Sequence, residues 1–90
     1  MYAIEYTRKF EKSLKLCQKR GYDMELFRKV ATILSQKGCL PSNYHPHRLF
    51  GKYADCWECH ILSDWLLIWK QNDKELTLLF TDTGTHSDLF

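Results

Sequence analysis

All four histidines of this 90-residue sequence lie beyond residue 44: His45, His47, His60 and His86. Two carboxylates accompany them, since Glu58 stands two residues before His60 and Asp64 lies in the turn that follows. Imidazole can both accept and donate a proton near neutral pH, because its reference pKa is roughly 6.5. These residue types favour general acid–base chemistry. A solvated histidine and an ordinary turn aspartate remain the structural alternative at each position.

The run Cys56-Trp57-Glu58-Cys59-His60 matches the C-x-x-C-H pattern of covalent haem attachment. The run reads as part of a strand, however, and side chains of a strand alternate between its two faces. The two cysteines would then lie on opposite sides of the sheet, which neither one porphyrin nor one zinc ion could bridge. Glu58 and His60 would share a face. We therefore expect neither a haem nor a metal site here.

Among the reactions that such groups can catalyse, cleavage of RNA requires the fewest additional groups from the protein. The ribose 2′-OH is the nucleophile, so the protein must remove its proton, stabilise charge on phosphorus and protonate the leaving 5′ oxygen. Imidazoles suit both proton transfers, and cationic side chains suit the charge. Aromatic rings can stack on bases. The candidates for stacking are Tyr44, Tyr53, Trp57 and Phe90, although Trp57 and Trp69 are favoured as core residues.

The charge of the chain is unevenly distributed. Residues 1–52 contain eleven Lys or Arg and four Asp or Glu, whereas residues 53–90 contain two and seven. A basic half can hold a polyanion through its phosphates, although any single lysine is more often part of a solvated helix face. Without further information these patterns indicate a basic α+β domain that could act on RNA.

Composition also bears on the compartment. Apolar residues make up 44% of the chain and charged residues 27%, as in an ordinary globular protein. No apolar run approaches the roughly 18 residues that span a bilayer, and the first ten residues do not resemble an export signal. We expect a cytoplasmic protein whose four cysteines remain free thiols.

The N-terminal half must supply the scaffold for these residues. Residues 2–6 alternate briefly, as in a short strand. Thr7 is a candidate N-cap for a helix that ends near Gly21, and Asp23 caps a second helix that ends at Gly38. Apolar residues recur along each helix with helical periodicity, which predicts one buried face for each. The two helices are close enough in sequence to form an antiparallel hairpin.

The remaining sequence has strand character after a Pro-containing loop at residues 39–46. Links of hairpin length, among them Gly51-Lys52, favour an antiparallel meander. The four predicted strands are residues 47–50, 53–61, 65–70 and 75–81. The order β-α-α-β-β-β-β predicts a single α+β domain over residues 1–90. Its two-helix hairpin would pack on one face of a mainly antiparallel sheet of four to five strands.

Four segments carry a family resemblance: IEYTRKFEKSLKLCQKRGYDM (4–24), HRLFGKY (47–53), ECHILSDWLLIWK (58–70) and DTGTHSDLF (82–90). With them the chain resembles the YafQ branch of the RelE/ParE-type bacterial toxins over essentially its whole length. The resemblance implies a compact α+β fold like that of microbial ribonucleases. It also implies a ribosome-dependent endoribonuclease that cuts mRNA in the ribosomal A site and is held inactive by a cognate antitoxin.

The same resemblance implies roles for the candidate catalytic residues. His86, in the T-G-T-H motif, would be the principal catalytic acid. His60 precedes the D-W motif and Asp64 belongs to it, and the two would complete the centre as base and proton-relay groups. His47 matches a further histidine of the branch.

Substrate contacts are implied as well. Phe90 matches a terminal aromatic residue that helps to position the substrate, and Glu58 lies where related sequences can have Asp. Some members place an Arg shortly before T-G-T-H, where it would neutralise the scissile phosphate, but this chain has Asp82. Because a carboxylate beside a phosphodiester is repulsive, Arg48 and Lys52 are the candidates for that positive charge.

The implied partners are the antitoxin, the ribosome and mRNA, with operator DNA bound only through the antitoxin complex and no membrane. Three lysines of the first helix are candidates for gripping ribosomal RNA: Lys12, Lys15 and Lys19. An alternative is an inactive antitoxin-binding module in operator repression, in which Asp82 has cost the activity. A gyrase-poisoning relative would share the fold, but it would leave the histidines without a task.

Overall fold

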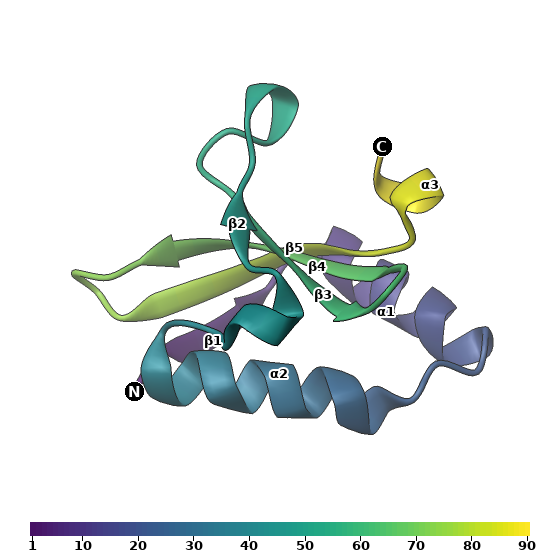
Figure 1. The fold of residues 1–90 in the computed structure, drawn as a ribbon, viewed down its shortest axis with the longest axis horizontal. Coiled ribbons are helices and arrows are strands. Elements are labelled where there is room, and N and C mark those ends of the chain that lie inside the picture. Colours follow the sequence, from purple (N-terminus) through teal and green to yellow (C-terminus); the bar gives the residue numbers. More distant parts are fainter.

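Five strands form one mainly antiparallel sheet in the computed structural model, which describes residues 1–90 (Figure 1). The elements are β1 (Ala3–Tyr6), α1 (Arg8–Lys19), α2 (Met24–Lys37), the 3-10 turn η1 (Ser42–Tyr44), β2 (His47–Arg48), the 3-10 turn η2 (Gly51–Tyr53), β3 (Trp57–Leu62), β4 (Trp65–Asn72), β5 (Thr77–Gly84) and α3 (His86–Leu89). The spatial order is β1-β5-β4-β3-β2, with only β1 and β5 parallel. The predicted α+β fold class is confirmed.

Both long helices begin and end where the sequence predicts. Thr7 accepts a hydrogen bond from the backbone N–H of Phe10 at 3.0 Å, and Asp23 accepts one from that of Glu25 at 3.0 Å. Such caps satisfy amide groups that have no partner within the helix. Gly38 ends α2 in the left-handed region, at φ 68°, where glycine avoids the strain of a Cβ atom.

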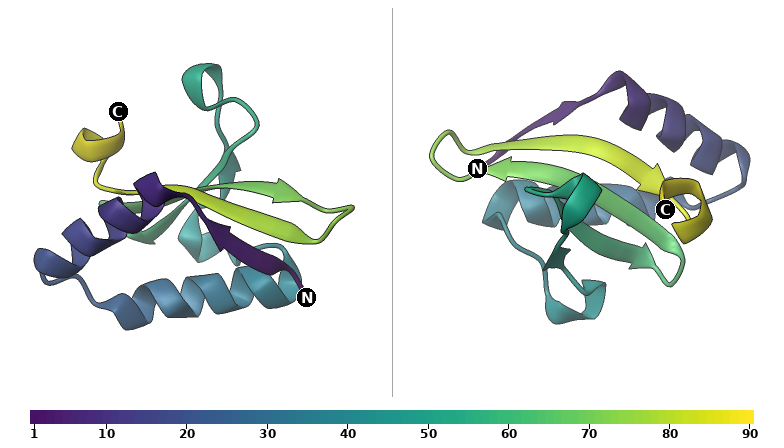
Figure 2. Two further views of the ribbon diagram at one scale, coloured as in Figure 1. Left: turned by 180° about the vertical axis from the view of Figure 1, so that it is seen from behind. Right: turned by 90° about the horizontal axis from the view of Figure 1, so that it is seen from above.

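The main core lies between the sheet and these two helices, which cover the same face of it (Figure 2). Burial of each large apolar side chain contributes roughly 1.5–3 kcal/mol relative to exposure. The fully or almost fully buried members include Phe10, Val30, Leu34, Trp65, Leu67, Trp69 and Phe80. The two helices therefore cover one face of the sheet, and the opposite face remains accessible for a functional site.

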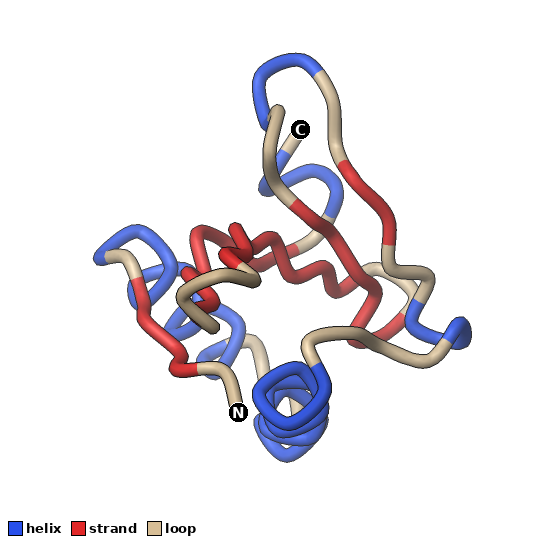
Figure 3. Tube along the Cα trace, turned by 90° about the vertical axis from the view of Figure 1, so that its left-hand side faces the viewer, coloured by secondary structure: helices blue, strands red, loops and turns tan.

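That other face has a small core of its own, formed by Cys56, Leu66, Ile68 and Leu89. Leu89 belongs to α3, so its burial anchors the C-terminal turn on the sheet. Figure 3 looks nearly along α2 and shows the η2 segment and the C-terminus on the far side of the sheet from that helix. None of the helices is long and apolar enough to cross a membrane.

The predicted meander is wrong between residues 47 and 56. The predicted strand 47–50 contracts to β2, and the predicted strand 53–61 begins only at β3, so Gly51-Lys52 is not a hairpin turn. Gly51 has φ 65° and Asp55 has φ 70°. Positive φ values interrupt extended backbone, and the chain between them forms η2 instead.

The last predicted strand, residues 75–81, is displaced toward the C-terminus and becomes β5. The side-chain oxygen of Asn72 accepts hydrogen bonds from the backbone N–H groups of Lys74 and Glu75, both at 3.0 Å. These bonds hold a turn where the strand was expected. The tail beyond β5, for which the sequence predicted no regular element, forms α3 with a capping box between Thr85 and Asp88.

Candidate active site

The four histidines meet on the sheet face opposite α1 and α2. His60, from β3, is at the centre: its ring centroid lies 5.5 Å from that of His45, 6.4 Å from that of His47 and 5.9 Å from that of His86. The four rings come from β2, β3, α3 and the turn after η1. The fold thus brings together His47, His60 and His86 from the predicted set and adds His45.

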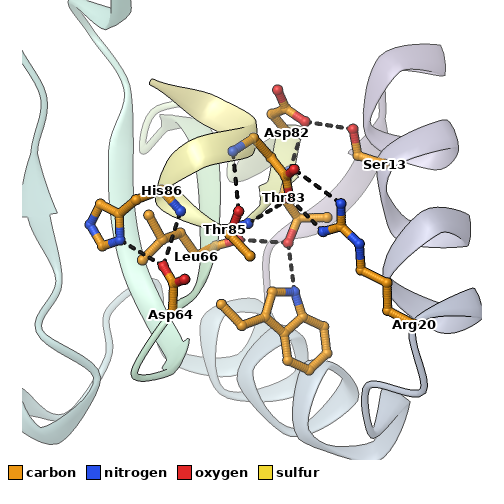
Figure 4. A network of polar contacts seen from close by, with 10 residues as sticks. Ser13, Arg20, Asp64, Leu66, Asp82, Thr83, Thr85 and His86 are labelled. Carbon is orange, nitrogen blue, oxygen red and sulfur yellow. Dashed lines mark hydrogen bonds and ion pairs between the residues drawn. The ribbon is translucent and has the colours of Figure 1, made fainter.

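His86 is held by Asp64 through two hydrogen bonds (Figure 4). One carboxylate oxygen of Asp64 accepts from the backbone N–H of His86 at 3.0 Å and lies 2.8 Å from its Nδ1. The backbone bond, and then the ring bond, lower the pKa of Asp64 below its ordinary value. An ionised carboxylate can only accept, so Nδ1 carries a proton and Nε2 is the free nitrogen of His86.

His60 is half-buried, and neither of its ring nitrogens has a hydrogen-bond partner within the protein. Its two nitrogens and Nε2 of His86 are therefore available to a ligand. Two free imidazoles whose ring centroids are 5.9 Å apart can flank one phosphodiester, one ring as base and the other as acid.

His47 is in a different situation, because both of its nitrogens already have partners. Nδ1 lies 2.8 Å from the carbonyl oxygen of His45, and Nε2 lies 3.1 Å from Oε1 of Glu58. Glu58 is buried, and its second oxygen has no hydrogen-bond partner. A carbonyl only accepts, so Nδ1 of His47 donates to it. This geometry suits His47 for positioning and charge stabilisation better than for proton transfer to a substrate.

Two features border the histidine cluster. On one side is a hollow of about 600 Å³, lined by Asn43, Tyr44, His45, His60, Ile61, Leu62 and Ser63. On the other side Phe90 is 61% exposed, with its ring centroid 6.3 Å from that of His86 and 5.3 Å from that of Tyr53. The hydroxyl of Tyr53 donates to the backbone oxygen of Leu89 at 2.9 Å, which ties η2 to α3. An extended ligand can thus contact the imidazoles and an exposed aromatic ring together.

A family model for the bacterial toxin YafQ of type II toxin–antitoxin systems matches residues 2–90. The chain belongs to the YafQ toxin family. It is 40% identical over 88 residues to the mRNA interferase toxin YafQ of Escherichia coli strain K12, covering 97% of this chain and 94% of that protein. The family resemblance carried by the four sequence segments is therefore confirmed.

Solved structures of bacterial toxins are similar to this chain over its whole length. The crystal structure of YafQ from E. coli BL21(DE3) matches with a TM-score of 0.91 and 36% identity, covering 100% of this chain and 99% of that one. YafQ in the E. coli DinJ–YafQ complex matches with a TM-score of 0.89 and 37% identity, again covering 100% of this chain and 99% of that one. A metal-bound toxin from Helicobacter pylori matches with a TM-score of 0.90 and 39% identity, and both chains are covered fully.

In this YafQ-family chain, a network behind His86 fixes the position of α3 (Figure 4). Two guanidinium nitrogens of Arg20, at the end of α1, donate to the two oxygens of Asp88 at 2.6 and 3.1 Å. Asp88 also accepts from the backbone N–H of Thr85 at 2.9 Å. The bonds from Arg20, more than those from Thr85, hold the pKa of Asp88 far below its ordinary value. The charged pair thus clamps the turn that begins at His86.

Sequence reasoning missed several of these residues. The Thr85–Asp88 capping box is readable as a T-x-x-D pattern. The pairing of Arg20 with Asp88 carries no such signal, since the two lie 68 residues apart. His45 was counted among the histidines but was not assigned to the site, because it lies in a loop whose path local patterns do not determine.

The proposed phosphate-binding role of Arg48 is not supported by its position. Arg48 pairs with Trp57 in the β2–β3 ladder, and its guanidinium carbon lies 5.6 Å from the centroid of the Trp57 ring. Trp57 packs against the main core, so Arg48 is on the face away from the histidines. Lys52 is placed differently: its Nζ lies 5.6 Å from the ring centroid of Tyr53, on the same side as Phe90.

Asp82 does not face the histidine cluster as a free negative charge. It is only 4% exposed, and one of its oxygens accepts from the Ser13 hydroxyl at 2.7 Å and from the backbone N–H of Thr83 at 2.9 Å. Nζ of Lys9 lies 3.3 Å from the other oxygen. This carboxylate is paired with α1, so the repulsion of substrate phosphate that the sequence suggested is offset by a neighbouring cation.

The three candidate ribosome-binding lysines lie on the solvent side of α1 and are exposed: Lys12, Lys15 and Lys19. The structure does not bring them to the histidine cluster. The two cysteines of the C-x-x-C-H run are also apart, because Cys56 belongs to the small core and Cys59 to the main one. The strand interpretation of that run is confirmed from Trp57 onward, whereas Cys56 precedes β3. No group of three His, Cys, Asp or Glu side chains is arranged to hold a metal ion.

Proposed function

We propose that this chain is a ribosome-dependent endoribonuclease that cuts mRNA in the A site and so inhibits translation. The observation that carries the proposal is the pair of free imidazoles of His60 and His86, with ring centroids 5.9 Å apart. The Asp64 carboxylate holds the second ring. Family membership supports it, since the E. coli relative is named an mRNA interferase toxin.

The cleavage step can be written with these two groups alone. His60 removes the proton of the ribose 2′-OH, and the 2′ oxygen forms a bond to phosphorus. The bond from phosphorus to the 5′ oxygen breaks, and His86 donates its Nε2 proton to that oxygen. The products are a 2′,3′-cyclic phosphate and a 5′-hydroxyl. Asp64 accepts the bond from Nδ1 of His86, which leaves Nε2 of that ring to face the leaving oxygen.

No metal ion has a necessary part in this mechanism, because the nucleophile belongs to the substrate and imidazoles transfer both protons. We therefore propose that cleavage is independent of added divalent cations beyond those the ribosome itself requires. The site lies open to solvent beside the hollow, so the ribosome would hold the mRNA in place. Lys12, Lys15 and Lys19, exposed on α1, are candidates for contacts with ribosomal RNA.

The proposed regulation is by a cognate antitoxin. The E. coli relative has been solved in complex with DinJ, the antitoxin of that toxin–antitoxin pair. By analogy, a cognate antitoxin would neutralise this chain, and operator DNA would be contacted only through the complex. Translated mRNA as substrate would place the activity in the cytoplasm. The alternative of an inactive module rested on Asp82, and its pairing with Lys9 and Ser13 removes the reason to favour it.

Primer extension on mRNA translated in a purified system tests the proposal. Wild-type protein should produce cuts that are absent with His86→Ala and that disappear when a cognate antitoxin is added. Uncut mRNA with folded wild-type protein would overturn the proposal. Ser87→Ala, next to His86 and exposed, is the matched control and should cut like the wild type.

A further inference from the structure

A second groove, of about 300 Å³, lies on the same side of the sheet as the histidines. It is lined by Thr7, Lys9, Lys52, Tyr53, Ala54, Cys56, Lys70, Thr81 and Asp82. Three lysines that are far apart in sequence, from α1, η2 and β4, therefore meet around one depression. We call this the lysine groove. The lysine groove contains none of the histidines and does not contain Asp64, so it takes no part in the proposed acid–base steps.

The charge of the lysine groove is positive. Its one carboxylate, Asp82, is buried and already accepts bonds from Ser13 and Lys9. Lys52 and Lys70 are exposed, and neither takes part in an ion pair within the protein. Two uncompensated ammonium groups therefore face solvent at this depression. Such groups attract phosphates without regard to base sequence.

The groove is continuous with the candidate active site through two aromatic rings. Tyr53 lines the groove, and its ring centroid lies 5.3 Å from that of Phe90. Phe90 in turn lies 6.3 Å from His86, centroid to centroid. A strand that leaves the imidazoles can cross Phe90 and Tyr53 by base stacking and then enter the lysine groove.

We propose that the lysine groove binds backbone phosphates of the mRNA strand next to the scissile bond, with Lys52 and Lys70 as the contacting cations. This inference rests on the proposed function and names a part of the substrate that the histidines do not touch. Lysine is a flexible point charge that contacts phosphate without bidentate geometry. The groove should therefore strengthen binding of any sequence equally and leave sequence preference to the hollow beside His60.

The test uses a short single-stranded RNA in which every 2′-OH is methylated, so that it cannot be cleaved. Its affinity for the wild-type protein, Lys52→Gln, Lys70→Gln and the double variant is measured by fluorescence anisotropy over a series of salt concentrations. Each lysine that contacts a phosphate should contribute about 0.7 to the slope of log affinity against log salt. We expect the slope to fall by about 0.7 for each single variant and about 1.4 for the double variant.

Lys74→Gln, in the turn between β4 and β5, is the matched control and should leave the slope unchanged. Lys9 is kept in all variants, because its loss would deprive the buried Asp82 of its cation. Unaltered slopes in the Lys52 and Lys70 variants overturn the proposal, as does a wild-type protein that fails to bind the oligonucleotide at low salt. A loss of antitoxin affinity with normal RNA binding also overturns it, since the groove would then serve an acidic peptide.

Cleavage of translated mRNA by the same proteins separates this inference from the proposed function. If the wild-type protein cleaves mRNA but the salt slopes of the variants are unchanged, only the proposal for the lysine groove is contradicted. If the slopes fall as expected but the wild-type protein does not cleave mRNA, the lysine groove is supported as a phosphate site and the proposed nuclease activity is contradicted.

Discussion

One carboxylate oxygen of Asp64 binds His86 twice, at 3.0 Å to the backbone N–H and at 2.8 Å to Nδ1. The first bond satisfies an amide at the start of α3, and the second fixes which ring nitrogen carries the proton. A single side chain thus sets both the position and the tautomer of the proposed catalytic acid. Asp64 stands in the turn before β4, so the pairing of β3 with β4 supports the geometry.

Asp64→Asn should lower the rate of mRNA cleavage by about 10²-fold or more, within the usual contribution of an acid–base group. The amide keeps the size of the side chain, but its oxygen accepts the Nδ1 bond less strongly than a carboxylate does. Single-turnover cleavage on the ribosome measures the effect. Asp55→Asn, in a turn where asparagine is equally well accommodated, serves as the control. A wild-type rate in Asp64→Asn would contradict the assigned role.

The bond between Asp64 and His86 should be insensitive to pH across the neutral range. Because the pKa of Asp64 is lowered in the folded chain, the interaction is complete above its ordinary value of about 4 and is lost only as pH falls through the lowered value. The side-chain carboxyl resonance of Asp64 should therefore show its own titration only below the ordinary pH range of an aspartate. A carboxyl of Asp64 that titrates at or above its ordinary pKa would contradict the two bonds to His86.

Loss of His47 should destabilise the fold more than a change at an exposed histidine usually does. In His47→Ala the buried Glu58 loses its partner at 3.1 Å, while its other oxygen already has none. An unpartnered buried polar group costs about 1–3 kcal/mol, to be measured by urea unfolding. Adding Glu58→Gln to that variant should recover part of the loss, because a neutral amide is cheaper to bury. No recovery would contradict the assignment of His47 as the partner that Glu58 needs.

The clamp between Arg20 and Asp88 should matter for catalysis more than for stability. Arg20→Ala releases the turn that carries His86, and a displacement of about 1 Å at a catalytic group can lower the rate by as much as 10²-fold. Arg20→Lys keeps the charge but loses one of the two bonds, so it should recover part of the rate. The measurement is single-turnover cleavage, with the unfolding midpoint as a check. Equal rates for the Ala and Lys variants would contradict a positional role.

Much of the fold was predictable because the periodic elements are locally determined. The apolar faces of α1 and α2, their caps at Thr7 and Asp23, and the doubly buried β4 all follow from short-range patterns. The prediction failed between β2 and β3. There Gly51 and Asp55 adopt positive φ values, which the alternation of apolar residues in the sequence does not reveal.

The site was predictable in its residue types and partly in its grouping. Alternation along β3 placed Glu58 and His60 on one face, but it could not show that Glu58 is buried against His47. The effect of Asp82 was misjudged because its partners Lys9 and Ser13 come from the other end of the chain. Contacts of that length depend on packing, which sequence patterns report only indirectly.

The division of roles between the two free imidazoles can be tested most directly with an mRNA whose scissile 5′ oxygen is replaced by sulfur. A thiolate leaves without receiving a proton, so the substrate no longer needs a general acid, but it still needs a base at the 2′-OH. On the ribosome, His86→Ala should cut this substrate at close to the wild-type rate, and His60→Ala should remain slow. If His86→Ala stays inactive, or if the sulfur rescues His60→Ala instead, the arrangement of acid and base proposed for this site is contradicted.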